Sequence, residues 1–307
     1  MTGPEENGPM HPDQLVLSQE LAAQLITDLL PGTDPATIRL LPTSATTSTV
    51  VRIGEDLAAR FPLEPSDPDA ARAALTAEHE AMAEFAAVCP LPAPGPVALG
   101  EPSAEFPMPW SVQTWVPGEV AEPVILEGSD AAADDLAALL LALRAAPTRD
   151  RRFQGPGRGG DLTVHEDWVR ECLERSRDLL PVDILAARWE RWRRLPRRDP
   201  DVMSHRDLIP ANLLTAGGRL VGVLDAGGYG PADPALDLVG AWHLLDAERR
   251  TRLRERLGGS DLEWERGAAW AFVQAIGLVW YYEHTNRTMA ELGRSTLRRL
   301  LEDPGVG

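Results

Sequence analysis

Four polar residues late in the chain have the types and spacing of a catalytic site. His205, Asp207 and Asn212 follow one another across a tight, proline-containing loop that leads into an apolar strand, and Asp225 ends the next strand. Carboxylate and amide oxygens suit a hard cation such as Mg²⁺, which takes one or two protein carboxylates and completes its shell with phosphate and water. Asp207 then remains to hold a substrate hydroxyl for in-line attack and to accept its proton.

Each of these residues also has a purely structural interpretation. Asp207 and Asn212 are turn formers of the kind found beside proline, and Asp225 could cap a strand. The combination is harder to obtain by chance, because the five-residue gap is followed by an apolar strand that ends in aspartate. We therefore treat the cluster as a candidate site.

The elements around this cluster change from mixed to helical along the chain. We expect a helix from Ser18 to Pro31, an antiparallel sheet over 37–64, a helix over 69–89 and short strands at 97–99 and 110–116. After Pro117-Gly118 the pattern predicts helices over 129–145, 165–179, 181–194 and 265–282, interrupted by a hairpin of 212–214 with 220–224. This organisation predicts an α+β protein with domains 1–117 and 118–307.

Length and charge limit the classes of function. A chain of 307 residues is long enough for about two domains and for a sizeable core. The formal charge of -17 disfavours nucleic acid and anionic membranes as partners. All 30 basic residues are arginine, which excludes a Walker A loop and a lysine Schiff base. Phosphate charge must therefore be met by arginine, a helix N-terminus or a metal ion.

The cysteine count and the first residues favour a cytoplasmic protein. Cys89 and Cys172 are far apart and match no metal-ligand spacing, as expected of small buried side chains in a reducing compartment. The N-terminal residues lack the basic start and apolar run of a signal peptide. No apolar run is long enough to span a membrane.

Two segments around the cluster resemble a known family. HRDLIPANLL and GVLDAGGYGPADPALDL are similar to the catalytic and metal-binding loops of the aminoglycoside phosphotransferase family. That family usually reads His-Gly-Asp, four residues, Asn, and then Ile-Asp-Phe or Ile-Asp-Trp. The likeness covers nearly the whole chain, since VVRIGEDLAARFP resembles the second and third strands, WSVQTWVPGE the hinge and WYYEHTNRTM a stretch of the C-terminal helices. It implies a protein-kinase-like two-lobed fold, with a small antiparallel-sheet N-lobe and a mainly helical C-lobe.

The resemblance implies a role for each residue of the cluster. Asp207 is expected to be the catalytic aspartate in a loop that His205 supports and that contains Arg206. Asn212 and Asp225 are expected to be Mg²⁺ ligands. The two aspartates of GPADPALDL, Asp233 and Asp237, are expected to brace the metal loop and cap the next helix rather than to bind the ion.

The same resemblance implies a nucleotide-binding N-lobe. Arg60 falls where the family often has the lysine that meets the α- and β-phosphates, and Glu78 is the acid expected to pair with it. The remaining nucleotide-binding residues are expected to be a Ser/Thr turn over the phosphates and a hinge strand along the base, namely Thr46, Thr47 and Ser48, and Gln113, Trp115 and Val116.

The chain departs from the family pattern at three positions. Arg206 stands where glycine is usual, so that the motif reads like the His-Arg-Asp of protein kinases, and Ala226 stands where Phe or Trp is common. Arg60 is not equivalent to lysine, because its planar fork needs more room and a different phosphate geometry. Arg60 as a surface arginine and Glu78 as an ordinary helix-face charge remain open alternatives.

Acidic and aromatic residues near the C-terminal helices are candidates for binding the acceptor. Asp167 and Glu171 are four residues apart on one predicted helix, and Glu283 lies close to Trp280. Such a mixture suits a cationic acceptor, for example an amino sugar. The alternative is that the aromatic residues form the core and the acids a solvated face.

Together these features predict a Mg²⁺-dependent enzyme that transfers the γ-phosphoryl group of ATP or GTP to a hydroxyl of a small molecule. An aminoglycoside or another antibiotic or natural product is the acceptor class that the resemblance implies. Two alternatives stay open. One is a kinase-like protein that binds nucleotide or ligand without turnover, which Arg206 and the missing lysine favour. The other is a metal-dependent hydrolase built from His205, Asp207, Asp225 and Asp233.

Overall fold

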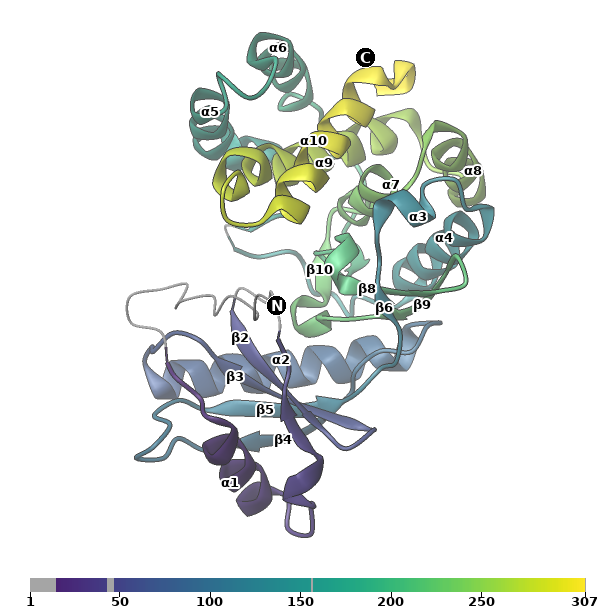
Figure 1. Cartoon of the computed structure of the whole chain (residues 1–307). Coiled ribbons are helices and arrows are strands. Elements are labelled where there is room, and N and C mark those ends of the chain that lie inside the picture. Colours follow the sequence, from purple (N-terminus) through teal and green to yellow (C-terminus); the bar gives the residue numbers. More distant parts are fainter. Residues whose placement is uncertain (1–14, 43–46, 156, 307) are drawn as a thin grey trace. The chain divides into compact units, whose positions relative to one another are not determined.

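A computed structural model describes residues 15–42, 47–155 and 157–306, so the predicted site residue Thr46 lies outside the described residues. The chain divides into two compact units. The first contains the chain up to Ala83 together with Pro94–Val116, and the second contains Glu84–Ala93 and the chain from Pro117 onward (Figure 1). The two units are described separately.

The first unit is built on a five-stranded antiparallel sheet of order β1-β2-β3-β5-β4. Its strands are β1 (Ile38–Leu40), β2 (Ser48–Ile53), β3 (Leu57–Pro62), β4 (Pro96–Gly100) and β5 (Trp110–Thr114), with a short helical turn at Pro35–Thr37. The helix α1 (Gln19–Leu29) precedes the sheet and begins as predicted, with the Ser18 hydroxyl accepting from Leu21 N. Side chains of α1, including Ile26, pack with Val51, Phe61 and Trp110 of the sheet in one apolar core.

The long helix α2 (Pro68–Val88) follows β3, close to the helix predicted over 69–89. Met82 and Phe85 near its end are buried, whereas Leu75 is only half-buried. The end of α2 and the proline-rich segment after it, residues 84–93, belong to the second unit.

The second unit is mainly helical. Its helices are α3 (Pro123–Leu126), α4 (Asp130–Ala145), α5 (Glu166–Arg175), α6 (Val182–Trp192), α7 (Val239–Leu244), α8 (Ala247–Leu257), α9 (Asp261–Tyr282) and α10 (Arg287–Glu302). Of these helices, α4, α5, α6 and α9 were predicted from the sequence and the other four were not. The prediction of α9 began four residues too late, because Ser260 caps the helix through Glu263 N.

Short strands support the loops of the second unit. They are β6 (Glu119–Val120), β7 (Val202–Ser204), β8 (Leu213–Ala216), β9 (Arg219–Val223) and β10 (Gly230–Ala232). The predicted hairpin is β8–β9, and Gly217 and Gly218 turn it with φ angles of 59° and 75°, which glycine adopts without strain. Asn212 was predicted to begin the first strand of this hairpin. Instead it ends a short helical turn, Pro210–Asn212, directly before β8.

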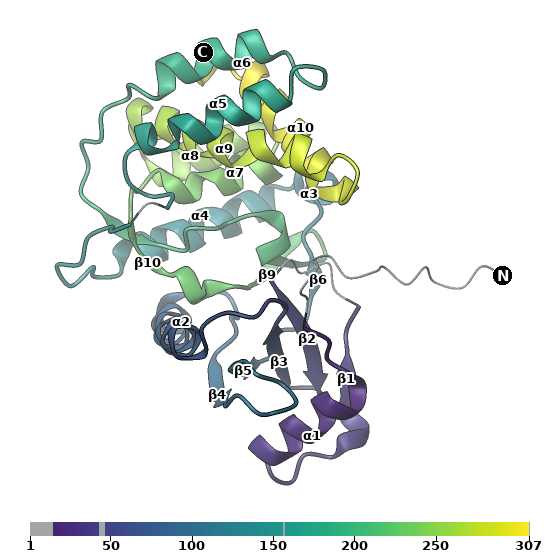
Figure 2. The ribbon, with the colours of Figure 1, turned by 90° about the vertical axis from the view of Figure 1, so that its left-hand side faces the viewer.

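Helix α9 is the central element of the second unit. It contacts α5, α6, α7 and α10, which Figure 2 shows gathered around it. Small residues permit this packing, since a Cβ added at Gly267 would lie 2.7 Å from Leu238 and one added at Gly293 would lie 3.0 Å from a carbonyl of α9. Among the described residues, no helix is long and apolar enough to cross a membrane.

Candidate active site

The loop that carries Asp207 is anchored at its start by a pair of short strands. Strand β7 ends at Ser204 and pairs with β10 in antiparallel register, Ser204 opposite Gly230. Directly after the strand, the backbone N–H groups of His205 and Arg206 donate to the two oxygens of Asp237, at 2.8 and 3.0 Å. Burial raises the pKa of Asp237, and nearby His205 and these N–H groups oppose the rise. Asp237 was expected to brace the metal loop and cap the next helix, whereas in the structure it holds the start of the loop of Asp207.

Arg206 adopts a backbone conformation that favours glycine. Its φ is 72°, in the left-handed region that side chains rarely occupy. The guanidinium donates to the carbonyl of Pro231 at 2.7 Å and lies over the Phe153 ring. Gly230 leaves space for it, because a Cβ there would be 2.9 Å from Arg206 Nη2. The glycine usual in this motif is thus replaced by an arginine whose side chain packs on β10.

His205 links the loop to the strand that precedes Asp225. Its ring Nε2 lies 2.9 Å from the carbonyl of Leu224, which can only accept, so Nε2 carries the proton. Its Nδ1 accepts from the backbone N–H of Asp207 at 3.3 Å. His205 is buried and holds the Asp207 backbone in place, which is the supporting position expected for it.

The carboxylate of Asp207 is half-exposed and unequally hydrogen-bonded. Its Oδ1 accepts from Arg158 Nη2 and from Gln274 Nε2, both at 2.8 Å. Its Oδ2 accepts from Asn212 Nδ2 at the longer distance of 3.2 Å. The two donors on Oδ1 leave Oδ2 as the oxygen better placed to accept a further hydrogen bond.

Asn212 and Asp225 lie at the same end of the β8–β9 hairpin. The backbone N–H of Leu224 donates to the Asn212 carbonyl at 2.8 Å, one residue beyond the strand register. The Asn212 amide nitrogen donates to the Asp207 carbonyl and carboxylate, which directs its Oδ1 the other way. Asp225 is exposed and has a left-handed backbone, with φ 57°.

The side-chain oxygens of Asn212 and Asp225 fit Mg²⁺ better than they fit a metal ion that is bound by protein side chains alone. Mg²⁺ is usually bound by one or two carboxylates together with substrate phosphate and water. Within the described part of the chain, no cluster of three His, Cys, Asp or Glu side chains can hold a metal ion. Asn212 Oδ1 and the Asp225 carboxylate therefore match an ion that arrives with a phosphate ligand.

The structure does not assemble the alternative hydrolase site. Asp233 is buried, and its Oδ2 accepts from Arg266 Nε and Trp270 Nε1, both at 2.9 Å, while its Oδ1 accepts from Ala235 N. An aspartate committed to these donors is not available as a ligand beside His205 and Asp207. The hydrolase alternative is wrong on this point.

Arg158 and Gln274 were not identified from the sequence, although both bind Asp207. Arg158 lies in the glycine-rich loop before α5, 49 residues from Asp207, and its surroundings in the sequence give no signal of this contact. Gln274 is different, because it is a lone polar residue in the apolar run WAFVQAIGLVW of α9. A buried amide there requires partners and could have been singled out.

The predicted nucleotide-binding residues that the structure describes lie in the first unit. Arg60 is on β3, opposite Val50 and Ser111, and its Nε donates to the Ser48 hydroxyl at 3.3 Å. Thr47 is exposed and precedes β2, and Glu78 is on an exposed part of α2.

The predicted hinge is the end of β5 and the residues after it. Gln113 is on β5 opposite Ala58, and Trp115 N donates to the Asp56 carbonyl at 2.7 Å. The Arg52 guanidinium lies 4.1 Å from the centre of the Trp115 ring, and Val116 is buried.

The candidate acceptor residues are at the surface of α5 and the end of α9, and each acid has an arginine partner. Asp167 pairs with Arg170, Glu171 with Arg175 and Glu283 with Arg294. The Arg175 guanidinium also lies over the Trp280 ring, at 4.7 Å. This surface is therefore a set of ion pairs rather than a field of uncompensated negative charge.

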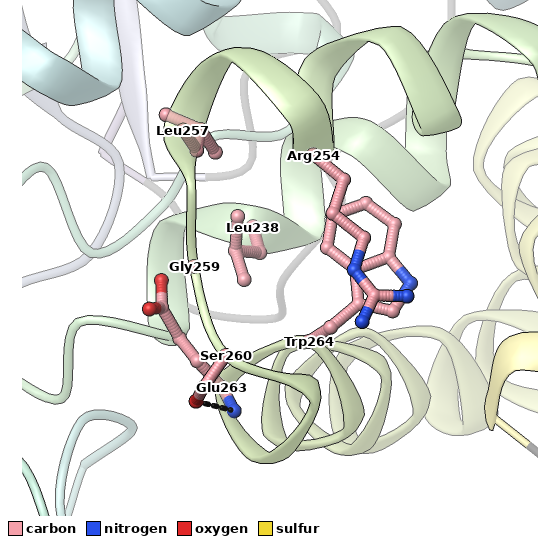
Figure 3. Close-up of a pocket in the computed structure, with 7 residues that line it drawn as sticks. All are labelled: Leu238, Arg254, Leu257, Gly259, Ser260, Glu263 and Trp264. Atoms are coloured by element: carbon pink, nitrogen blue, oxygen red, sulfur yellow. Dashed lines mark hydrogen bonds between the residues drawn. The ribbon is translucent and has the colours of Figure 1, made fainter.

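A small pocket elsewhere in the second unit contains none of these residues. Figure 3 shows its lining, in which Arg254 lies beside the Trp264 ring and Glu263 N donates to Ser260. Asp207 and its hydrogen-bond partners are not among the lining residues. We therefore assign this pocket no part in the candidate active site.

Solved structures of antibiotic phosphotransferases have the same fold. The GDP complex of aminoglycoside 2'-phosphotransferase-IIIa is 17% identical and matches 92% of this chain and 98% of its own with a TM-score of 0.65. Macrolide 2'-phosphotransferase MphH from Brachybacterium faecium is 20% identical and matches 91% and 96% with a TM-score of 0.56. The gentamicin complex of APH(2")-IIa is 17% identical and matches 95% and 98% with a TM-score of 0.59. These similarities confirm the predicted kinase-like α+β fold.

The family itself is identified by sequence. No curated protein sequence matches this chain at a significant level. A family model does match, over residues 26–275, which include β1–β10 and every described residue that binds Asp207. The recognition made from the HRDLIPANLL and GVLDAGGYG segments is confirmed, and the chain belongs to the phosphotransferase enzyme family, APH.

Proposed function

We propose that this phosphotransferase moves the γ-phosphoryl group of ATP or GTP to a hydroxyl of a small molecule, with Mg²⁺. The observation that carries the proposal is the unequal hydrogen bonding of the two Asp207 carboxylate oxygens. It is held by Arg158 and Gln274 on one oxygen and has the other oxygen nearly uncommitted, beside the Asn212–Asp225 pair. Such an arrangement suits a group that accepts a proton close to a metal-bound phosphate.

In the proposed reaction Asp207 Oδ2 accepts the proton of the acceptor hydroxyl. The hydroxyl oxygen forms a bond to the γ-phosphorus, and the bond from that phosphorus to the oxygen bridging the β- and γ-phosphates breaks. The nucleoside diphosphate leaves with that bridging oxygen. Asn212 and Asp225 would hold the ion, which supplies neutralisation of phosphate charge when it is bound. Positioning and charge neutralisation then account for most of the rate.

We assign nucleotide binding to the first unit and the acceptor to the second. In the first unit, Arg60 replaces lysine as the phosphate-binding cation, supported by Glu78, while Thr46, Thr47 and Ser48 cover the phosphates. Gln113, Trp115 and Val116 line the base with their backbone groups, except for the Trp115 N–H, which already donates to the Asp56 carbonyl. The extended β5 segment and the Arg60–Ser48 hydrogen bond are compatible with these roles. Guanidinium is a good phosphate partner in a planar geometry, so binding is expected to survive the loss of lysine.

The acceptor is a hydroxylated small molecule, and the charge that it carries is a separate question. Solved neighbours contain kanamycin or gentamicin. A cationic acceptor bound at α5 and α9 would replace Arg175 at Glu171 and Arg294 at Glu283 and would lie on Trp280, near Asp167. A cationic acceptor would exchange one exposed ion pair for another, which changes the free energy little. These acids therefore contribute only modestly to the affinity for the acceptor.

Thermal unfolding with and without Mg-ATP and Mg-GTP tests the proposal, on the wild-type protein and on Asp225→Asn. A ligand at 100 times its Kd stabilises the native state by about 2.7 kcal/mol. We expect wild type to be stabilised by at least one nucleotide and Asp225→Asn to lose that shift. Absence of a shift with either nucleotide at millimolar concentration would contradict the proposal. A shift without phosphoryl transfer to any acceptor would favour a protein that only binds nucleotide.

A further inference from the structure

Gln274 is a buried amide whose two ends have different partners. It lies in α9 and is 8% exposed. Its Nε2 is 2.8 Å from Asp207 Oδ1, and its Oε1 is 3.2 Å from His243 Nε2. His243 and Thr296, the next residues along this path, are completely buried. A buried polar chain of this kind is stable only when each member is satisfied.

The Asp207 carboxylate at one end of this series of hydrogen bonds fixes which atom donates and which accepts in each of them. A carboxylate can only accept, so the NH₂ group of Gln274 must face Asp207 and its Oε1 must face His243. His243 therefore donates from Nε2. Burial lowers the pKa of His243 to about 4, so that the neutral ring has a single N–H and its Nδ1 is an acceptor. The Thr296 hydroxyl, at 2.8 Å from Nδ1, must then be the donor.

The three residues come from three packed helices. His243 is in α7, Gln274 in α9 and Thr296 in α10, and α9 contacts both of the other helices. The approach of α10 to α9 is close, since a Cβ at Gly293 would lie 2.9 Å from Val279. Side chains in such surroundings have few alternative rotamers, so the Gln274 amide is held rigidly behind Asp207.

This arrangement distinguishes the two oxygens of Asp207. Oδ1 is occupied by Gln274 and by Arg158, whereas Oδ2 accepts a single longer bond from Asn212. We propose that Gln274, oriented by His243 and Thr296, is a positioning residue that fixes the rotation of the Asp207 carboxylate and reserves Oδ2 for the acceptor hydroxyl. The inference rests on the proposed function of Asp207 as the group that accepts the acceptor's proton.

The first test compares two substitutions at Thr296 that separate shape from hydrogen bonding. Thr296→Val keeps the volume and removes the hydroxyl donor, whereas Thr296→Ser keeps the hydroxyl and removes a methyl group. Loss of a methyl group from a buried site lowers stability. A purely structural role predicts that activity follows the melting temperature of each variant. The proposal predicts that Thr296→Ser retains wild-type kcat and that Thr296→Val loses it by about threefold to tenfold.

The second test removes the amide itself. Gln274→Met is similar in shape and makes neither hydrogen bond. We expect kcat to fall by about 10- to 100-fold with the nucleotide KM within about twofold of wild type, because Gln274 acts on Asp207 and not on nucleotide binding. The assay measures nucleoside diphosphate release from Mg-GTP and Mg-ATP, with water, kanamycin, gentamicin and streptomycin as acceptors. An unchanged kcat in Gln274→Met would overturn the proposal.

A spectroscopic measurement tests the direction of the hydrogen bonds at His243 independently of activity. The ring ¹⁵N shifts of His243, in protein labelled at histidine, report which nitrogen carries the proton at pH 7. The proposal requires the Nε2–H form in wild type and a changed ring signal in Gln274→Met. The Nδ1–H form in wild type would overturn it. If wild type transferred no phosphoryl group to any acceptor, the proposed function would fail, and the tautomer would still support or refute the chain of hydrogen bonds.

Discussion

The loop of Asp207 and the surface of α5 and α9 both gather acidic side chains beside arginine and aromatic rings, but they pair them differently. At the loop, Asp237 binds donors 31 and 32 residues away. Asp207 binds donors 49 and 67 residues away, in addition to Asn212, which is five residues away. At the surface, Asp167 and Glu171 pair with arginines only three or four residues away on the same helix. Contacts of the first kind tie distant elements together and thereby fix a geometry. Glu283 at the surface is intermediate, because its partner Arg294 is 11 residues away on α10.

This difference explains why charge composition alone is a poor guide to a site. A short-range pair on an exposed helix contributes little to stability and leaves both side chains mobile. A buried carboxylate that receives backbone and side-chain donors from several elements is held in one orientation. The following experiments measure how far the two regions differ, beginning with the largest expected effect.

Asp207→Asn removes the proposed proton acceptor and keeps the shape of the side chain. We expect the rate of phosphoryl transfer to fall by about 10²- to 10⁴-fold, the range typical of a general base, with little change in the melting temperature. Nucleotide binding, measured by the thermal shift with Mg-ATP or Mg-GTP, remains. A variant that retained more than about one-tenth of the wild-type rate would show that Asp207 is not the proton acceptor.

Asp233→Asn tests, through the stability of the protein, a third carboxylate that is buried and bound by distant donors. Asp233 is 2% exposed and accepts from Arg266 and Trp270, so its loss leaves a buried guanidinium without its counter-ion. We expect unfolding in urea to require about 3 kcal/mol less free energy. The matched surface variant is Asp167→Asn, whose side chain is 90% exposed and whose effect is expected within about 0.5 kcal/mol. Equal losses in the two variants would refute the distinction.

The sequence predicts the parts of the site that depend on local pattern. The α+β class, most of the sheet, the β8–β9 hairpin and the cluster from His205 to Asp225 follow from alternation, turn residues and motif spacing. Strands β7 and β10 have three residues each and are too short for a periodic signal. The contact of Arg158 with Asp207 depends on how a glycine-rich loop folds back on the unit, which spacing does not encode. Gln274 was detectable only as a polar residue in an apolar helix, without its partner.

The pH dependence of the free energy of unfolding tests whether the His243 side chain is buried in the folded protein. The pKa of His243 is about 4 in the folded protein, against an ordinary 6.5, because burial disfavours the charged ring and the Arg299 and Arg158 charges add to this. The unfolded chain therefore takes up the proton first as the pH falls, and stability present above pH 6.5 is lost toward pH 4. Between pH 7.5 and 5 this loss is about 2 kcal/mol.

Urea unfolding of wild type and His243→Gln at these two pH values isolates the contribution of the histidine. Both proteins contain the same carboxylates, so the difference in their pH dependence belongs to His243. We expect the variant to lose about 2 kcal/mol less than wild type on acidification. An identical pH dependence would mean that His243 is hydrated or charged in the folded protein.

Arg158→Gln removes one of the two donors on Asp207 Oδ1. The side chain is 36% exposed, so the pair with Asp207 is expected to contribute less than about 1 kcal/mol to stability. Its effect on positioning is larger, and we expect kcat to fall about tenfold, which corresponds to about 1.4 kcal/mol of the barrier. Arg152→Gln is the control, because this exposed arginine is in the same segment and is not among the side chains that donate to the Asp207 carboxylate. If both variants had the same kcat, Arg158 would have no role in positioning the Asp207 carboxylate.

Glu171→Gln and Glu283→Gln give the smallest effect and decide whether the α5–α9 surface belongs to the site at all. Each glutamate already binds an arginine, so a cationic acceptor gains only the difference between two exposed ion pairs. We expect the KM for kanamycin to rise about two- to threefold in each variant, with the nucleotide KM unchanged. A rise above tenfold would make these acids a principal binding surface. No change in either variant would confine the acceptor to the neighbourhood of Asp207, where Arg158 rather than an acid is the nearest charge.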